Sequence, residues 1–536
     1  MESIRVRNLR SIADSTTIAI KPISVLVGAN SSGKSTFLRT FPLVKQSQEM
    51  RTLGGLALNE GDVNFGLFNE ALRKDASPAE LRLEFGFTVE SDLPVPSSDI
   101  VISSSTMVIC ELTFNESDKD ARYPRLRAVK FKIHASDTPD EIDIQSSHSG
   151  EVSHLTVNGL RMSDEAKDLK LLVNRGLVPR LARALDTEDE ERSLFQVDEA
   201  GTSSLERVLL QKTDPYFHGR TGEETRLEMF NGITIASPQR MFAELRKKGS
   251  QTWNERTRHW TPETAKFNEI RNLLIAKSAN KILNVVSAYV TQLARSTYYF
   301  APVRAQVDRD YQSRDVSAVS VDPRGVNVAM VLAGMSLPEL SGFRKWLKER
   351  FRFEVFPKSV HDGARIALRM LDAATGTEFN LADTGFGYSQ MLPFLVQIWN
   401  LTDGIGYRRP MQRFGPRYYT HAPSSTPLIC IEQPELHLHP ALQARLAELI
   451  VDVARISQER RVHIRFVLET HSPVIIERMG QLIEAQRIGT DDIQIVLFEP
   501  DSSSPASNTS VVRATQFDSD GVLKNWPFGF LAAPLP

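Results

Sequence analysis

The sequence predicts an α/β fold that is interrupted by a long segment of mixed strands and helices. Near the start, an apolar run that ends at Val27 precedes a Gly-rich loop, and residues 34–48 follow with a helical pattern. After residue 298, apolar strands again alternate with helices, which is typical of a sheet flanked by helices. We therefore expect an N-terminal lobe at 1–90, an insertion domain at 91–297 and a C-terminal lobe at 298–536.

The periodicity of apolar residues predicts the elements within these parts. Alternation of apolar and polar residues indicates strands between about 79 and 160, and the pattern at 161–212 indicates helices. Residues 267–294 are expected to form one long amphipathic helix. In the C-terminal lobe we expect strands at 364–370, 427–431, 464–469 and 493–499, and helices at 386–401, 440–458 and 473–485.

The composition is that of an ordinary globular protein. The 536 residues are 41% hydrophobic and 24% charged, with a formal net charge of −2, which argues against a globally basic nucleic-acid coat protein. The two cysteines, Cys110 and Cys430, match no zinc-ligand spacing and form no disulfide framework. No secretory signal and no run of about 18 apolar residues is present. We therefore expect a cytoplasmic protein.

The loop GANSSGKS at residues 28–35 has the spacing of a phosphate-binding loop. Its two glycines allow the backbone to wrap around a phosphate chain, so that amide N–H groups point at the oxygens. Lys34 would reach the β- and γ-phosphates, and the Ser35 hydroxyl would be a ligand of Mg²⁺. The alternative is a chance match, which the strand before the loop and the helix after it argue against. We expect ATP and Mg²⁺ here, bound by Gly28, Asn30, Gly33, Lys34, Ser35 and Thr36.

Two later strands end in groups suited to phosphate chemistry. The strand at 427–431 leads to Glu432, and such an acid holds the water shell of Mg²⁺ in phosphate-loop ATPases. The strand at 464–469 leads to His471, which stands where a γ-phosphate sensor would be. The structural alternatives are a strand that ends in a charged turn and a surface histidine. A phosphate loop upstream favours the functional interpretation of both.

A third stretch, ADTGFGYSQMLPFL at 382–395, places glycines, Ser389 and Gln390 at the start of a predicted helix. Gly387 and Ser389 would offer backbone and hydroxyl donors to a phosphate. The structural alternative is a Gly-rich turn that caps a helix, and the motif by itself is a weak signal.

These pieces occur in the order of an ATPase family. They resemble the ABC-type P-loop ATPase head of the SMC, RecF and OLD-like families, over residues 1–90 and 298–536. The resemblance implies a mixed sheet flanked by helices and interrupted by an α+β insertion domain. It also implies that Gly385 to Gln390 form the signature motif, which reads the γ-phosphate bound to a partner subunit, and that His471 is the switch histidine. His439 stands at the D-loop position, and Gln46 or Gln48 would serve the Q-loop role.

The wording of the motifs is narrower than that superfamily. RNLRSI, GANSSGKST, APVRAQ, DPRG, IEQPELHLHP, ETHS and NWPFGF resemble the bacterial antiphage defence ATPases of the PtuA type, which belong to Septu and retron-associated systems. The resemblance implies a separate HNH nuclease as partner, and in retrons a reverse transcriptase with its RNA–DNA product. It implies a homodimer, or a higher homo-oligomer, that forms through the ATP sites.

One residue departs from the ABC pattern, which places a catalytic glutamate directly after the acid of the strand. This sequence has Gln433 there, and an amide cannot act as a general base. Glu435 is the nearest other carboxylate. ATP binding is therefore expected, whereas hydrolysis is expected to be slow, to use Glu435, or to be replaced by binding-driven switching.

Three alternative functions would leave different marks in the sequence. An OLD-like nuclease would carry a metal-binding domain with a Glu plus DxD set after the ATPase, but only 65 residues follow His471, and FDSDG at 517–521 is interpreted as a turn. A RecF- or SMC-like repair ATPase would bind DNA directly. A transporter subunit is disfavoured by the long insertion.

Two basic stretches are candidate nucleic-acid or partner surfaces. Residues 239–260 combine six basic residues with Trp253 and Trp260, which suits phosphate contact and base stacking. Residues 407–419 form a second basic and aromatic cluster. For each stretch the structural alternative is a solvated loop whose side-chain stems cover apolar surface. Arg304 and Arg324 would face the ATP dimer interface or form ordinary salt bridges.

Overall fold

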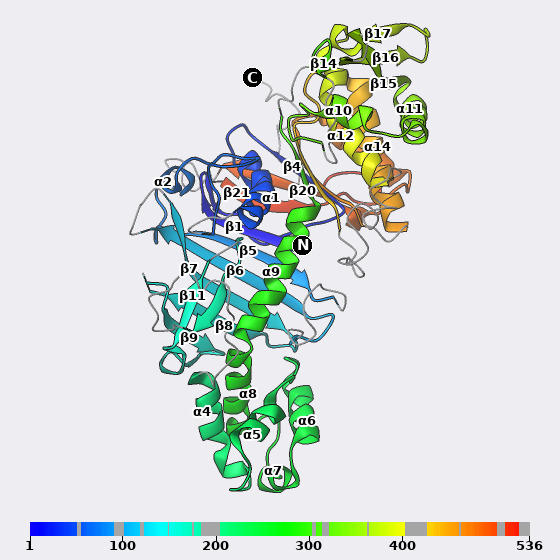
Figure 1. Ribbon diagram of the computed structural model, residues 1–536. Coiled ribbons are helices and arrows are strands. Elements are labelled where there is room, and N and C mark those ends of the chain that lie inside the picture. Colours follow the sequence, from blue (N-terminus) through cyan, green and yellow to red (C-terminus); the bar gives the residue numbers. More distant parts are fainter. Residues whose placement is uncertain are drawn as a thin grey trace. The chain divides into compact units, whose positions relative to one another are not determined.

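The computed structural model divides into two compact units (Figure 1). Unit 1 comprises Met1–Ala19 and Leu43–Arg295, and unit 2 comprises Ile20–Pro42 and Ser296–Pro536. Helix α1 (Lys34–Glu49) begins in unit 2 and ends in unit 1. The structure describes residues 1–50, 55–90, 101–117, 123–147, 149–173, 176–183, 204–302, 307–312, 321–361, 364–402, 426–459, 463–500 and 510–524.

Unit 1 is built on an antiparallel sheet with the strand order β10-β9-β8-β7-β6-β5-β1-β2, and β3 pairs with the other part of β1. In β5 the apolar side chains from Leu81 to Phe87 alternate with the partly buried Arg82 and Glu84, so the two faces differ in polarity. Helix α9 (Ala279–Ser296) packs on the apolar face, where Tyr289 stacks on Phe87 at 3.9 Å between ring centroids. The strands are β1 (Ser3–Leu9), β2 (Ile12–Asp14), β3 (Ile18–Ala19), β5 (Leu81–Thr88), β6 (Met107–Glu116), β7 (Pro124–His134), β8 (Asp140–Ser146), β9 (Val152–Val157) and β10 (Leu160–Arg161).

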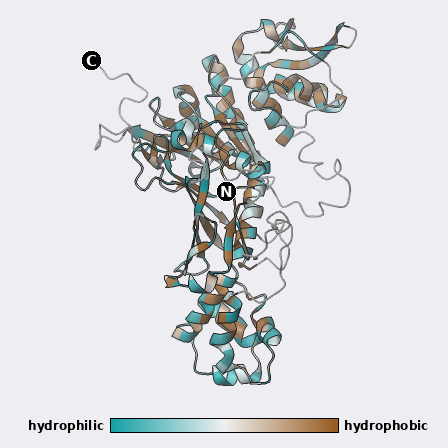
Figure 2. Ribbon diagram, turned by 60° about the vertical axis from the view of Figure 1, so that its left-hand side comes forward, coloured by the Kyte–Doolittle hydropathy of each residue, from teal (hydrophilic) through white to brown (hydrophobic). Residues whose placement is uncertain are grey.

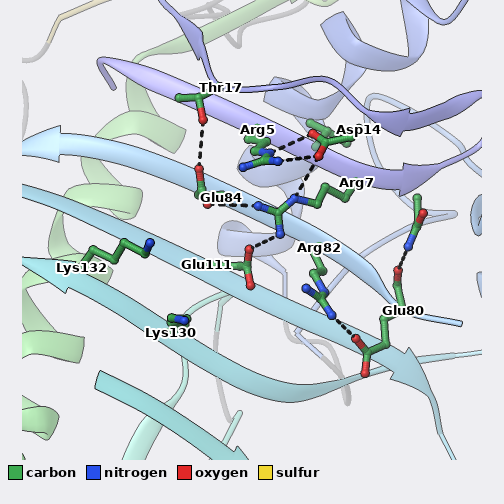
Figure 3. Close-up of polar contacts among 12 residues, drawn as sticks. Arg5, Arg7, Asp14, Thr17, Glu80, Arg82, Glu84, Glu111, Lys130 and Lys132 are labelled. Atoms are coloured by element: carbon green, nitrogen blue, oxygen red, sulfur yellow. Dashed lines mark hydrogen bonds and ion pairs between the residues drawn. The ribbon is translucent and has the colours of Figure 1, made fainter. Parts of the chain in front are cut away.

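The other face of this sheet carries a network of charges, drawn in Figure 3. Arg7 lies at its centre and reaches Glu111 at 2.7 Å, Asp14 at 3.5 Å and Glu84 at 3.6 Å. Arg5 donates to both carboxylate oxygens of Asp14, at 2.8 and 2.5 Å. Opposite charges on neighbouring strands therefore neutralise one another, and each such partly exposed pair contributes about 1 kcal/mol or less.

The remainder of unit 1 is a hairpin and a group of short helices, and Figure 2 shows hydrophobic and hydrophilic residues on the same helices of this group. The described elements are α2 (Phe68–Ala71), η2 (Asp164–Ala166), β11 (Leu169–Leu172), β12 (Arg180–Arg183), α4 (Ser204–Thr213), η3 (Asp214–Tyr216), α5 (Glu223–Phe230), α6 (Pro238–Lys248), α7 (Gln251–Arg256) and α8 (Ala265–Lys277).

Two sequence predictions fail in unit 1. The helices expected at 161–212 are wrong for the described residues up to 183, because β11 and β12 pair as an antiparallel hairpin there, whereas α4 forms at Ser204–Thr213. The single helix expected at 267–294 is two helices, α8 and α9, which are separated at Ser278. The Ser278 hydroxyl bonds the carbonyl of Leu274, a local bond that competes with continued helix.

Unit 2 is a mixed sheet flanked by helices, as the sequence predicts. Its strand order is β13-β18-β19-β4-β20-β21, and every neighbouring pair is parallel except β20 with β21. The strands are β4 (Ile23–Gly28), β13 (Thr297–Phe300), β18 (Leu428–Glu432), β19 (Arg465–Glu469), β20 (Ile493–Pro500) and β21 (Ser510–Thr515). The strands and helices predicted in the C-terminal lobe are confirmed to within two residues at each end.

The core of unit 2 packs Val25, Val27 and Ile431 of this sheet with apolar residues of helices α12 (Phe386–Thr402) and α14 (Pro440–Glu459). A smaller sheet, ordered β14-β16-β15 with β17 beside β16, completes the unit. The further elements are β14 (Tyr311–Gln312), α10 (Val328–Ala333), α11 (Leu337–Phe351), β15 (Phe353–Val360), β16 (Arg365–Asp372), β17 (Glu378–Asn380), η5 (Leu381–Asp383), α12 (Phe386–Thr402), α14 (Pro440–Glu459), α15 (Pro473–Glu484) and η6 (Thr490–Asp492).

These units differ from the three segments expected from the sequence. Strands β1 and β5, expected in the N-terminal lobe, lie in one sheet with β6–β10, expected in the insertion. In unit 2, the parallel strands β4, β18 and β19 end at the same edge of the sheet, which is where α/β proteins bind ligands. Among the described residues, no helix is long and apolar enough to cross a membrane.

Candidate nucleotide-binding site

The loop between β4 and α1 depends on its two glycines. Gly28 lies so close to β20 that a Cβ atom would stand 2.3 Å from the carbonyl oxygen of Phe498. Gly33 has a φ of +98°, which side chains disfavour. The loop therefore turns tightly into α1, and the first amides of any α-helix lack acceptors within the helix. Such a turn presents free N–H groups and the positive end of the helix dipole to an anion.

Lys34 is folded back into this loop. Its Nζ donates to the carbonyl oxygens of Gly28 at 3.0 Å and Ala29 at 2.6 Å, and the residue is only 3% exposed. Burial lowers the pKa of the ammonium group, an effect that the charge of Glu469 partly opposes. The ammonium is thus held inside the loop, where phosphate oxygens could replace the carbonyls.

Ser35 is bonded to a buried acid on the strand next to β4. Its Oγ donates to Oε1 of Glu469 at 2.8 Å, and Glu469 is 2% exposed. The other oxygen of that carboxylate, Oε2, is buried and has no hydrogen-bond partner in the structure. Burial, helped by the charge of the nearby Glu432 and opposed by the bond from Ser35, raises the pKa of Glu469 to about 7. Buried polar atoms without partners are rare, so this oxygen calls for an explanation.

Glu432 is clamped by two groups that the sequence did not point to. Arg39 donates from Nε and from its terminal NH2 group to the two carboxylate oxygens, at 2.7 and 2.8 Å. The Tyr299 hydroxyl donates to Oε1 at 2.7 Å. Glu432 is 1% exposed, and its bond to Arg39 raises the pKa of the guanidinium. Burial, together with the charge of Glu432, raises the pKa of Tyr299. This buried acid is therefore well compensated.

The residues after these strands tie the two strand ends together. The backbone N–H of Gln433 donates to the carbonyl of Glu469 at 2.8 Å, and Gln433 has a φ of +42°. Oε1 of Glu435 accepts the backbone N–H of His471 at 2.6 Å. Burial and the charge of Lys34 lower the pKa of His471, which favours the neutral imidazole near pH 7.

The stretch Gly385 to Gln390 covers the start of α12. A Cβ at Gly387 would stand 2.7 Å from the carbonyl oxygen of His437, so this turn packs on the loop after β18. Ser389 is buried, and its hydroxyl donates to the carbonyl of Phe386 at 2.7 Å within the same helix. Gln390 is buried as well, whereas Gly385 is exposed and Phe386 is 52% exposed.

The other residues that the sequence predicts for the site differ in their exposure and in their partners. In the loop, Asn30 is exposed and Thr36 is buried. His439 is exposed, as is Arg324. Both candidate glutamines are used inside unit 1. The Gln46 amide bonds the backbone of Ala57 and Val63, and the Gln48 amide bonds Thr291 and the backbone of Leu177. Arg304 and the stretch 407–419 lie outside the described residues.

The predicted base-stacking surface at 239–260 is wrong in its aromatic part. Trp253 and Trp260 are 1% and 5% exposed and pack on Tyr216, and Trp253 also packs on Phe217 and Phe230. Large apolar rings stabilise a small group of helices more when they are buried in its core than when they lie on its surface. Three of the basic residues also bond backbone carbonyls, Arg246 those of Asn254 and Thr257, Arg256 those of Pro215 and Phe217, and Lys248 that of Asn231. Arg240, Lys247 and Arg258 are exposed.

Sequence reasoning missed Arg39, Tyr299 and Glu469. Glu469 had a signal, since it ends an apolar strand just as Glu432 does. Arg39 lies one helical turn after Ser35, a spacing that brings side chains onto one face. Tyr299 is brought to Glu432 only by the pairing of β13 with β18, which no local pattern reveals. Among the described residues, no group of three or more His, Cys, Asp or Glu side chains is placed to hold a metal ion.

Comparison with known proteins adds one family. The model of the family described as AAA ATPase domain matches residues 1–476, which include the loop, Glu432 and His471. No match is found among curated proteins. Among solved structures, the SMC head domain from Thermotoga maritima is similar over 96% of this chain and 97% of that chain, with 8% identity and a TM-score of 0.30.

The clamp on Glu432 predicts strong coupling between two substitutions. Arg39→Ala is expected to destabilise the protein by up to about 3 kcal/mol, because it leaves a buried carboxylate without its cation. Adding Glu432→Gln to Arg39→Ala should recover much of that loss, since a neutral amide is cheaper to bury. Denaturant unfolding of both single variants and the double variant checks this, and additive losses would contradict it.

The raised pKa of Glu469 predicts a pH dependence in the absence of nucleotide and metal. The folded pKa of about 7 lies above the ordinary value of 4.5, so folding binds a proton in this window. The contribution of Glu469 to stability is therefore most favourable below about pH 4.5 and is lost as the pH rises through 7. Glu469→Gln should gain stability relative to the unaltered protein between pH 5 and 8, as followed by thermal unfolding. Parallel pH curves for the two proteins would refute this.

Proposed function

This chain belongs to the AAA ATPase domain family, and from that premise we propose that it binds ATP at the loop Gly28 to Ser35 and hydrolyses it slowly. The observation that carries the proposal is the state of Lys34 and Ser35 in the loop. One is a buried cation that donates to two carbonyl oxygens of the loop, and the other is a hydroxyl bonded to a buried acid. The oxygens of a triphosphate would replace the carbonyls as partners of Lys34 and would accept hydrogen bonds from the backbone amides at the start of α1.

The residues present also suit Mg²⁺. The ion prefers oxygen ligands and keeps several waters, and the loop offers the Ser35 hydroxyl next to the buried, unpartnered oxygen of Glu469. Ser35 would hold the ion, and a carboxylate at the strand ends would contact its water shell. When bound, the ion would neutralise charge on the phosphates. Asn30, Gly33 and Thr36 would line the rest of the phosphate site.

Turnover is limited by the group after Glu432. Gln433 can orient a water molecule but cannot accept its proton. Glu435 is the next carboxylate, but its Oε1 accepts the N–H of His471 and supports the strand ends. His471 would sense the γ-phosphate as a neutral imidazole, in line with its lowered pKa. ATP binding would then act mainly as a switch.

We further propose that two copies close on two ATP molecules. The residues Gly385 to Gln390 would then face Lys34 and Ser35 of the other copy, as the resemblance to ABC-type heads implies. In its support, the aromatic Phe386 at the start of α12 is 52% exposed, beside the buried Ser389.

The motif resemblance supports a defence role for this switch. We propose an HNH nuclease as the regulated partner in antiphage defence, with a reverse transcriptase and its RNA–DNA product where the system is a retron. The second candidate is a RecF- or SMC-like ATPase that binds DNA directly, which the exposed cations Arg240, Lys247 and Arg258 favour. ATP-dependent DNA binding by the purified chain alone supports the second candidate. ATP-dependent capture of the HNH protein supports the first, and metal-dependent cleavage by the chain alone would indicate an OLD-like nuclease.

Lys34→Ala is expected to weaken ATP binding about 10- to 100-fold, because it removes charge-assisted bonds to the phosphates. The matched control is Lys45→Ala, which removes a lysine of the same helix that pairs with Asp62 at 3.8 Å. Equilibrium titration with a fluorescent ATP analogue measures both. Equal affinities of the two variants would refute ATP binding at this loop.

Gln433→Glu is expected to raise the ATP turnover roughly tenfold or more, because it restores a general base next to Glu432. Its affinity for ATP should stay close to that of the unaltered protein. Steady-state phosphate release under saturating ATP gives the answer. An unchanged or lower rate with normal ATP binding would show that residue 433 does not limit hydrolysis.

A further inference from the structure

The strand order of unit 2 places the two buried acids, Glu432 and Glu469, at different distances from the phosphate loop. Strand β19 lies between β18 and β4, and Glu469 is the Cα partner of Glu432 on one side and of Leu26 on the other. Neighbouring strands stand about 4.8 Å apart, so Glu432 ends two strands away from the loop strand and Glu469 only one. Glu469 is therefore the acid that the fold brings next to Ser35.

The contacts of the two acids point the same way. Both oxygens of Glu432 are bonded by Arg39, and one of them also by Tyr299. Glu469 bonds the Ser35 hydroxyl through Oε1 alone, and its Oε2 is buried without a partner. A serine hydroxyl can donate to a carboxylate while its lone pairs bind a cation. The Ser35–Glu469 pair therefore brings a hydroxyl oxygen and a carboxylate oxygen within 2.8 Å of each other, and the charge of the buried Lys34 ammonium acts on the same carboxylate.

We propose that Glu469, paired with Ser35, is the carboxylate that binds the water shell of the Mg²⁺ accompanying ATP, while Glu432 chiefly positions Arg39 and Tyr299. This inference rests on the proposed function and deepens it. A buried acid with an unused oxygen is costly in the empty protein, and a hydrated divalent cation would use that oxygen. If Glu469 were only a brace for Ser35, glutamine would serve as well, because its amide oxygen also accepts the hydroxyl proton.

The test measures the dissociation constant of ATP once with excess Mg²⁺ and once with EDTA. The value in EDTA divided by the value with Mg²⁺ is the ratio that expresses the Mg²⁺ dependence. Glu469→Gln should lower this ratio about 10- to 100-fold and leave ATP binding in EDTA intact. Glu432→Gln should keep most of the ratio. The control is Glu448→Gln in α14, which removes a carboxylate of unit 2 that bonds Arg478, and it should keep the full ratio.

An unchanged ratio in Glu469→Gln would overturn this inference, as would a ratio that Glu432→Gln abolishes and Glu469→Gln preserves. Thermal unfolding shows whether Glu469→Gln folds. If it does not, Glu469→Asp replaces it, because that variant keeps the charge but withdraws the carboxylate from Ser35. It should also lower the ratio, and an unchanged ratio would count against the proposal. An unaltered protein that binds no ATP in either condition would overturn the proposed function itself, and this inference with it.

Discussion

Two carboxylates, Glu432 and Glu469, are buried side by side at the ends of neighbouring parallel strands, and the edge of the sheet is organised around their charge. Two buried like charges are tolerated only with compensation. For Glu432 it comes from Arg39 and Tyr299. For Glu469 it is incomplete, since one oxygen has the Ser35 hydroxyl and the other has no partner. The Glu469 carboxylate, whose compensation is incomplete, is bonded to Ser35 of the phosphate loop. We infer that a nucleotide and its cation complete this compensation.

Hydrogen bonds connect the loop, the strand ends and helix α1 to one another. Lys34 and Arg39 lie on the same helix, and each reaches toward this edge of the sheet, one to the loop carbonyls and the other to Glu432. Because Gln433 and Glu435 bond the backbone of Glu469 and His471, a shift at one strand end is transmitted to the other. ATP binding would then shift the ends of β18 and β19 as well as the loop, even where hydrolysis is slow.

Much of unit 2 could be predicted from the sequence, because its strands are continuous apolar runs and its helices carry clear apolar stripes. The phosphate loop was found for the same reason, as its spacing is local. Arg39 and Tyr299 depend on contacts between segments far apart in the chain, so no local pattern identified them. The basic stretch at 239–260 misled in the opposite way. Its tryptophans have the composition of a stacking surface, but the fold uses Trp253 and Trp260 as core.

The central claim is that the backbone of the loop and the first turn of α1 bind the phosphates of ATP. Hydrogen–deuterium exchange with and without Mg²⁺ and ATP measures this directly, because amides that donate to phosphate oxygens exchange more slowly. We expect slowed exchange at residues 28–36, together with 469–471 at the end of β19. Bound ATP that leaves residues 28–36 unprotected would contradict the account.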